Sequence, residues 1–136
     1  MRVLIDTNIL VSAALNPGGT PYRAYLKAVS FPNQCYVSDQ NIDELRRVFN
    51  RKFPHKIDAM EAFLALALNV LKIIPTPVEE KEEEGRIRDP ADRPILRAAT
   101  GAGVDAIVTG DRDFLESGIV KPRILTAAQF VGQEHL

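Results

Sequence analysis

The chain has 136 residues, of which 46% are hydrophobic and 26% are charged, and this size and composition are typical of one soluble globular domain with its own core. Its 17 Lys and Arg residues nearly balance its 18 Asp and Glu residues, which gives a formal net charge of −1. This balance excludes the broadly basic surface that non-specific duplex-binding proteins usually carry, so any nucleic-acid binding must be local. We expect a single domain over residues 1–136.

The first half of the chain alternates short apolar runs with amphipathic segments. Residues 3–5 and 34–37 are predicted strands. Asp6, Thr7 and Asn8 form a polar turn before a predicted helix over residues 9–15, which residues 16–19 stop. A second helix runs from Pro21 to about residue 29, and Ser38 is a good N-cap for a third that reaches about residue 52.

The second half continues the alternation. Residues 58 to about 71 predict a helix that is apolar nearly all round, hence deeply packed or at a subunit interface, which favours a homodimer. A strand is expected at 73–75, a solvated acidic connection at 78–90, and a helix at 92–100 that ends at Gly101 and Gly103. Residues 105–109 predict a buried strand, 124–125 an edge strand and 127–131 a closing helix. Strands that alternate with helices predict an α/β fold: a parallel central sheet of about four to five strands flanked by helices, a Rossmann-like three-layer sandwich.

The single cysteine, Cys35, excludes an internal disulfide framework and a cysteine-rich zinc site. It lies in an apolar run where a buried structural thiol is expected. The first apolar run meets Asp6 too soon for a signal peptide, and the mostly apolar residues 62–71 are too few to span a bilayer. We therefore expect a cytoplasmic protein that does not enter the membrane.

Acidic residues follow the predicted strands at the points where an open parallel sheet binds its ligands. Asp6 follows the first strand, Asp111 follows the strand that ends at Thr109, Asp92 opens a helix, and Glu44 lies in the second turn of the helix after residue 37. Each one alone is better explained as a cap or turn residue.

Together, carboxylates that converge on one sheet edge repel one another and lose hydration, which a protein tolerates chiefly when a divalent cation neutralises them. A set of oxygen ligands without Cys or His suits Mg²⁺ or Mn²⁺ and not zinc. Such an ion activates a water molecule and stabilises charge on a phosphoryl oxygen.

These motifs resemble the PIN-domain family over nearly the whole chain. Residues 3–13 (VLIDTNILVSA) resemble its opening, Ser38 with Glu44 and Leu45 its second motif, residues 89–96 (DPADRPIL) with Ala98 and Ala99 its third, and residues 108–115 (VTGDRDFL) its fourth. Pro94 departs slightly from the third motif, although the first turn of a helix tolerates proline.

The resemblance implies that Asp6, Glu44 and Asp92 bind the metal and that Asp111 supports a second ion or orients the water. It also implies that Thr7 and Asn8 accompany the first Asp; for both of them, and for Thr109, a structural role and a contact with substrate stay open. The similarity is greatest to small prokaryotic members, including VapC-like toxins of toxin-antitoxin pairs. This implies a metal-dependent ribonuclease that cuts single-stranded RNA and is inhibited by a cognate antitoxin.

Two other functions stay open. An Asp after the first strand and the pair Gly110-Asp111 also suggest a phosphatase of the haloacid-dehalogenase type, but that class needs a second Asp where this chain has Asn8. The other alternative is a non-catalytic binding module on the same fold.

Several polar residues near the motifs have simpler explanations. We expect Asp92, and not Asp89, to be the ligand of the third motif, because Asp89 precedes Pro90 at the end of a mobile acidic connection. His55 and His135 are expected at the surface, and capping or solvation explains Asp43 and Asp113. Five arginines are either solvated or contact RNA phosphate: Arg46, Arg47, Arg93, Arg97 and Arg112.

Overall fold

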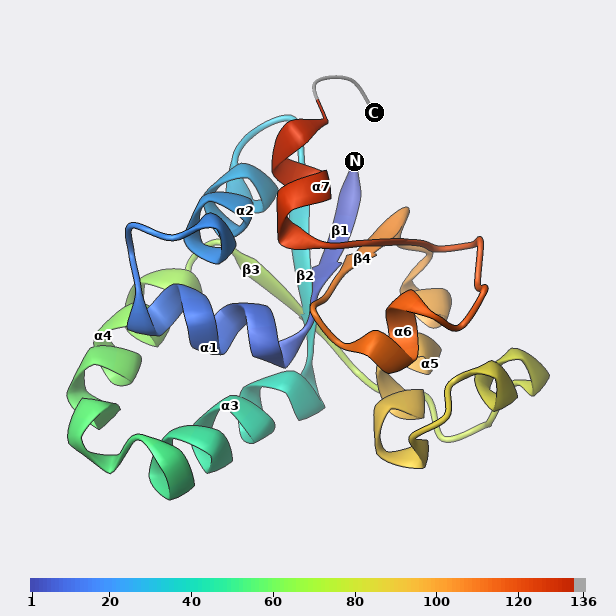
Figure 1. Ribbon diagram of the computed structural model, residues 1–136, viewed down its shortest axis with the longest axis horizontal. Helices are drawn as coiled ribbons and strands as arrows, with labels where there is room; N and C mark the ends of the chain where they lie inside the picture. The colour runs from blue at the N-terminus through green and yellow to red at the C-terminus, as the bar shows by residue number, and fades with distance from the viewer. Residues whose placement is uncertain (134–136) are drawn as a thin grey trace.

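A five-stranded sheet lies between two layers of helices in the computed structural model, which describes residues 1–133 (Figure 1). The strands are β1 (Arg2–Ile5), β2 (Gln34–Ser38), β3 (Leu71–Ile74), β4 (Ala106–Val108) and β5 (Arg123–Leu125). The helices are α1 (Thr7–Leu15), α2 (Thr20–Val29), α3 (Asp39–Lys52), α4 (Ile57–Ala67), α5 (Arg93–Ala102), α6 (Arg112–Leu115) and α7 (Ala127–Gly132). Three short 3₁₀ helices are η1 (Pro54–Lys56), η2 (Glu82–Arg86) and η3 (Pro90–Asp92).

The strand order is β3-β2-β1-β4-β5, and every neighbouring pair is parallel. The prediction of a parallel α/β sheet is confirmed, including the position of β5 at an edge. The order reverses between β1 and β4, which share the centre of the sheet. In open parallel sheets, the crevice beyond the carboxyl ends of the strands at such a reversal is where ligands bind.

Alternating side chains of each strand divide the core into two halves. Val3 and Ile5 of β1 pack with α1, α2, α3, α4 and α7, whereas Leu4 packs with α5 and α6 on the other face. Cys35 is buried in the first half, as expected for a structural thiol. Within residues 1–133, no helix combines the length and the apolar character needed to cross a membrane.

Two predicted helix boundaries differ from the structure. The helix α1 begins at Thr7 and not after Asn8, because Asp6 is its N-cap and leaves no separate turn. The helix α4 ends at Ala67, after which the chain pairs Leu71 with Cys35 in the sheet. Only one face of α4 is buried, and Leu66 is 74% exposed. Of the two alternatives expected for this helix, deep packing is therefore wrong, and the subunit interface stays a prediction.

The acidic segment 78–90 is not the fully solvated connection that the sequence predicts. Ile87 is buried, and the side chain of Glu84 is 4% exposed because Arg97 of α5 donates hydrogen bonds to both of its carboxylate oxygens, the shortest at 2.8 Å. Arg97 also donates to the carbonyl oxygen of Pro77 and holds the pKa of Glu84 below its usual value. This ion pair fixes the segment against α5, and it also makes Arg97 unavailable to RNA.

We predict that breaking this ion pair costs far more stability than breaking a surface pair. Arg97→Met leaves the Glu84 carboxylate buried without its partner, which costs about 3 to 5 kcal/mol. Arg46→Met is the matched control, because Arg46 and its partner Glu61 have side chains 45% and 50% exposed, and such pairs contribute about 1 kcal/mol or less. Urea unfolding of both variants measures the difference. If the two variants lost equally little unfolding free energy, segment 78–90 would be solvated, as the sequence predicts.

Candidate active site

Asp6 lies directly after β1, at the centre of the carboxyl edge of the sheet. Its Oδ1 accepts a hydrogen bond from the backbone N–H of Thr7 at 2.8 Å, and its Oδ2 accepts from the Thr109 hydroxyl at 2.8 Å and from Asn8 Nδ2 at 3.2 Å. The residue is 5% exposed, and this burial raises the pKa of its carboxyl from 3.8 to about 6. The Asp6 carboxylate is therefore held by hydrogen bonds and removed from water, and none of these three partners carries a positive charge.

Asn41 connects the second acidic segment to the first. Its Oδ1 accepts from the backbone N–H of Ser38, and Ser38 Oγ accepts in return from the Asn41 N–H, so the pair caps α3. Its Nδ2 donates to the Thr7 hydroxyl at 2.8 Å, and this hydroxyl lies 3.4 Å from the exposed carboxylate of Glu44. Sequence analysis did not single out Asn41, although the spacing of three from Ser38 is that of a capping box.

Asp111 is held beside Asp6 by the residues that end β4. The Thr109 hydroxyl accepts from the backbone N–H of Asp111 at 3.0 Å, and Asn8 Oδ1 accepts from the N–H of Gly110 at 2.9 Å. Asp111 itself caps α6 by accepting from the N–H of Asp113. Thr109 and Asn8 therefore have a structural role in this site, as hydrogen-bond partners that join β1 to β4.

Asp92 approaches from the other side of the edge, at the start of α5. Desolvation raises the pKa of its carboxyl to about 8, together with a hydrogen bond to Asp111 and repulsion from Asp111, Asp6 and Asp89. It makes no side-chain hydrogen bond as an N-cap of α5. The explanation of Asp92 as a capping residue therefore has no support in the structure.

The four acids named from the sequence line one cleft of about 380 Å³. The cleft also holds polar and apolar side chains from α1 and cationic side chains from the end of α3. Its lining consists of Asp6, Thr7, Asn8, Val11, Ser12, Glu44, Val48, Arg51, Lys52, Phe53, Asp92 and Asp111. Sequence analysis did not identify Arg51 and Lys52 as part of this cleft.

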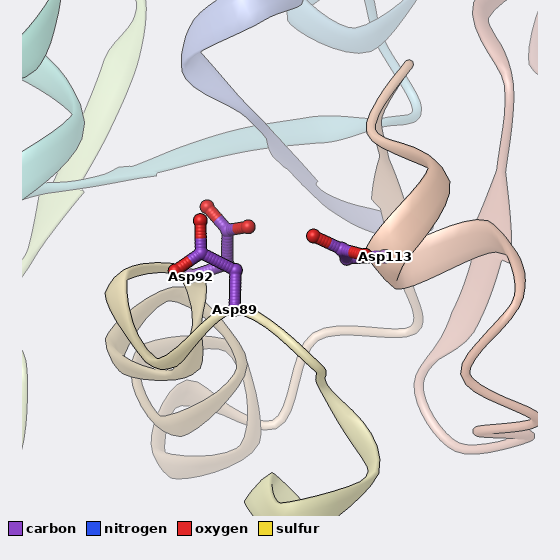
Figure 2. A group of neighbouring side chains, drawn as sticks. All are labelled: Asp89, Asp92 and Asp113. Carbon is purple, nitrogen blue, oxygen red and sulfur yellow. The ribbon is translucent and has the colours of Figure 1, made fainter.

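A second acidic group adjoins the first and shares Asp92 with it. Figure 2 shows Asp89 and Asp92 on the turn before α5, with Asp113 facing them from α6. One carboxylate oxygen of each lies within 4.8 Å of the others. Asp89 is fixed by the N–H of Ala91, which its side chain accepts at 3.0 Å. Asp89 therefore lies in a hydrogen-bonded turn at the end of the acidic connection.

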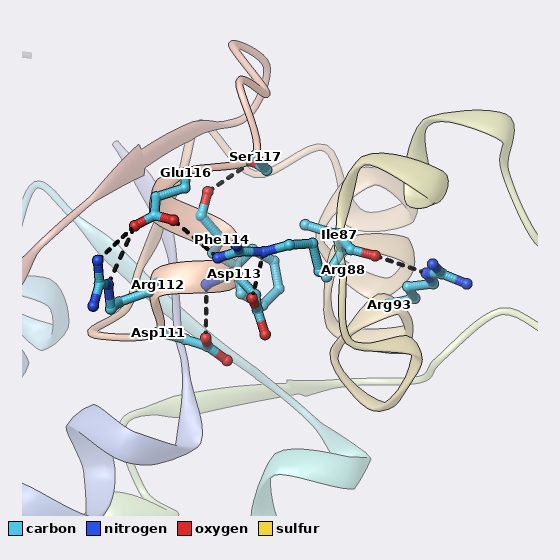
Figure 3. A network of polar contacts seen from close by, with 9 residues as sticks. All are labelled: Ile87, Arg88, Arg93, Asp111, Arg112, Asp113, Phe114, Glu116 and Ser117. Atoms are coloured by element: carbon cyan, nitrogen blue, oxygen red, sulfur yellow. Dashed lines mark hydrogen bonds and ion pairs between the residues drawn. The ribbon is translucent and has the colours of Figure 1, made fainter.

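Arg88 partly neutralises this second group. It donates to Asp113 and to Glu116 at 2.9 Å each, and Arg112 also binds Glu116 (Figure 3). A cation at Asp113 would have to compete with the guanidinium of Arg88. No such arginine contacts Asp6 or Asp111 within residues 1–133, so the first group is the better candidate for a metal.

Among residues 1–133, none of the remaining polar candidates lines the acidic cleft. His55 and Asp43 are exposed, as expected, whereas His135 lies outside the described residues. Arg93 donates to the carbonyl oxygen of Ile87 and Arg46 to Glu61.

We predict that removing the Asp92 carboxylate stabilises the metal-free protein at alkaline pH. Its pKa is raised to about 8 in the fold, whereas an unfolded Asp titrates near about 4. The protonated Asp92 side chain therefore contributes stability that is fully present below about pH 4 and is lost as the pH rises towards 8. In EDTA, Asp92→Asn should melt a few degrees above the wild type at about pH 9, and this gain should shrink with falling pH and be nearly absent at about pH 4.

Asp43→Asn is the control for this measurement, because it makes the same change of charge on an exposed residue of α3. It should shift the melting temperature little at either pH. If both variants gained equally at alkaline pH, net charge and not repulsion within the cleft would be the cause.

Comparisons with known proteins agree with this geometry. A family model described as "PIN domain" matches residues 2–113. No curated protein matches the chain. Solved structures, in contrast, match over almost their whole length.

Three solved structures have a similar fold at low sequence identity. VapBC2 from Rickettsia felis, bound to a DNA fragment from its promoter, has a chain with 21% identity and a TM-score of 0.68, covering 92% of this chain and 97% of its own. Mycobacterium tuberculosis VapC20, described as a sarcin-ricin loop cleaving toxin, has 18% identity and a TM-score of 0.61, covering 88% and 97%. FitAB bound to a DNA fragment has 19% identity and a TM-score of 0.66, covering 98% of both chains.

These likenesses show the fold, and the family model shows the family. It covers most of the chain, from β1 to the start of α6. The chain belongs to the PIN-domain family.

Proposed function

We propose that this chain is a ribonuclease that hydrolyses single-stranded RNA with Mg²⁺ or Mn²⁺ held by Asp6, Glu44, Asp92 and Asp111. One observation carries the proposal. These carboxylates come from separate segments of the chain and line one cleft, where the pKa values of Asp6 and Asp92 are raised to about 6 and about 8. A bound cation favours the charged forms that desolvation and repulsion otherwise disfavour.

The donor set fits these ions. The side-chain oxygen donors of the cleft are carboxylates, hydroxyls and an amide, and among the described residues its lining includes no His or Cys. Oxygen-only sites suit Mg²⁺ and Mn²⁺, and Mg²⁺ keeps several of its waters. When bound, such an ion activates water and neutralises charge on the phosphoryl group.

The protein side chains divide the remaining work. Asp6 is held by three hydrogen bonds and offers ligand atoms at a fixed position, which lowers the entropy lost on binding. Asp111 is fixed by its cap and supports a second ion or orients the attacking water. Glu44 is exposed at the rim and can adjust to the ion.

Partners are proposed from the related structures. One of them is described as a toxin that cleaves the sarcin-ricin loop, and two are complexes named VapBC2 and FitAB with DNA. We propose that this chain is the toxin of a type II pair, acts in the cytoplasm and is inhibited by a cognate antitoxin. A homodimer is favoured by the exposed apolar side chains of Leu66 and Val70. Membership of the PIN-domain family removes the support for a haloacid-dehalogenase-type phosphatase.

We predict that the purified protein cleaves single-stranded RNA in Mg²⁺ or Mn²⁺ and stops when EDTA is added. Asp92→Asn should lose at least about tenfold in activity, equivalent to about 1.4 kcal/mol of barrier, because it removes a ligand carboxylate. Asp89→Asn should stay within a few-fold, because asparagine preserves the cap on the N–H of Ala91. Initial rates at saturating Mn²⁺ on one RNA substrate provide the comparison.

The reverse ranking of the two variants would put the metal on the second acidic group. Cleavage that continues in EDTA would exclude the metal mechanism. RNA binding without cleavage in any divalent metal would instead favour the non-catalytic binding module.

A further inference from the structure

The cleft is acidic at one end and cationic at the other, and one face of α3 connects the two ends. Glu44, Val48, Arg51 and Lys52 are spaced by four, three and one residues, so they lie on one side of a helix. All of them line the cleft. The helix that supplies the acidic rim therefore also supplies the cations.

Arg51 and Lys52 are available to a ligand. Both are exposed, and among residues 1–133 no ion pair includes either of them. Arg46 of the same helix differs, because it pairs with Glu61. Cations in the last turn of a helix also interact favourably with the helix dipole, so their presence alone does not require a ligand.

The separation of the two ends indicates what kind of anion fits. With a rise of about 1.5 Å per residue, Arg51 lies about 10 Å along α3 from Glu44. A strand with successive phosphates fits this separation better than a single phosphate group does. Between them, Val48 and Phe53 give the cleft half-buried apolar side chains, and aromatic and apolar surfaces accept the bases of a single strand.

We propose that Arg51 and Lys52 bind a backbone phosphate of the RNA strand on a nucleotide next to the one at the acidic end. The proposal rests on the ribonuclease function above and assigns the path of the strand: along α3, from the carboxylates to its last turn. A cleft of about 380 Å³ has the size of a small-ligand site, which fits one or two nucleotides of a single strand.

The test is the salt dependence of RNA binding by Arg51→Gln/Lys52→Gln. Its matched control is Lys121→Gln/Arg123→Gln, which removes the same charge at the opposite edge of the sheet, where β5 begins. Fluorescence anisotropy with a labelled single-stranded RNA of about twelve nucleotides, in Ca²⁺ in place of Mn²⁺, gives Kd at several salt concentrations. A gel after each titration checks that the RNA is intact.

We expect Kd of the α3 variant to rise about tenfold at low salt. The slope of log K against log salt should become shallower by about 0.7, which is the contribution of one phosphate contact on a single strand. The control variant should stay within about twofold and keep the wild-type slope. Melting curves of both variants separate this loss from any loss of helix stability.

Two outcomes overturn the inference while the proposed function stands. One is that the wild type cleaves RNA in Mn²⁺ and the α3 variant binds RNA with the wild-type Kd, whether or not its melting temperature is lower. The other is that both variants weaken binding equally, which would reflect net charge only. If the wild type neither binds nor cleaves RNA, the proposed function fails together with this inference.

Discussion

A buried carboxylate between the two central strands is the constraint on which the site depends. Asp6 is 5% exposed and receives hydrogen bonds from Thr7, Asn8 and Thr109, but no cationic side chain among residues 1–133 forms an ion pair with it. Raising its pKa from 3.8 to about 6 costs the ionised fold about 3 kcal/mol. A fold that served only stability would gain by replacing such a group.

The rest of the edge is arranged around this carboxylate. The hydroxyl of Thr109 bridges Asp6 and the backbone of Asp111, and Thr7 links α1 to Asn41 and Glu44 of α3. The ion pair between Glu84 and Arg97 ties the acidic segment to α5, the helix that Asp92 directly precedes. Residues distant in sequence thus hold like charges together, and a divalent cation is the simplest partner for them.

The sequence predicted those parts of the site that depend on local order. Asp6 and Asp111 were identified because each follows a strand, and the parallel sheet followed from the alternation of strands and helices. The contacts between segments were not predictable in this way. The burial of Glu84, the link from Asn41 to Thr7 and the approach of Asp113 to Asp92 depend on tertiary packing, and no spacing within the chain encodes them.

The same limit explains why the cationic end of the cleft was missed. Arg51 and Lys52 appear in the sequence as an ordinary basic helix end, and only the packing of α1 against α3 places them in a cleft with the acids. The adjoining group of Asp89, Asp92 and Asp113 competes for the metal, although Arg88 already pairs with Asp113.

Anomalous diffraction from crystals of the protein soaked in Mn²⁺ tests the central claim most directly, because it locates the ion without any assay of activity. We predict a peak that is coordinated by carboxylates of the set Asp6, Glu44, Asp92 and Asp111. A peak held by Asp89, Asp92 and Asp113 without Asp6, or no peak in the cleft at saturating Mn²⁺, would contradict the claim.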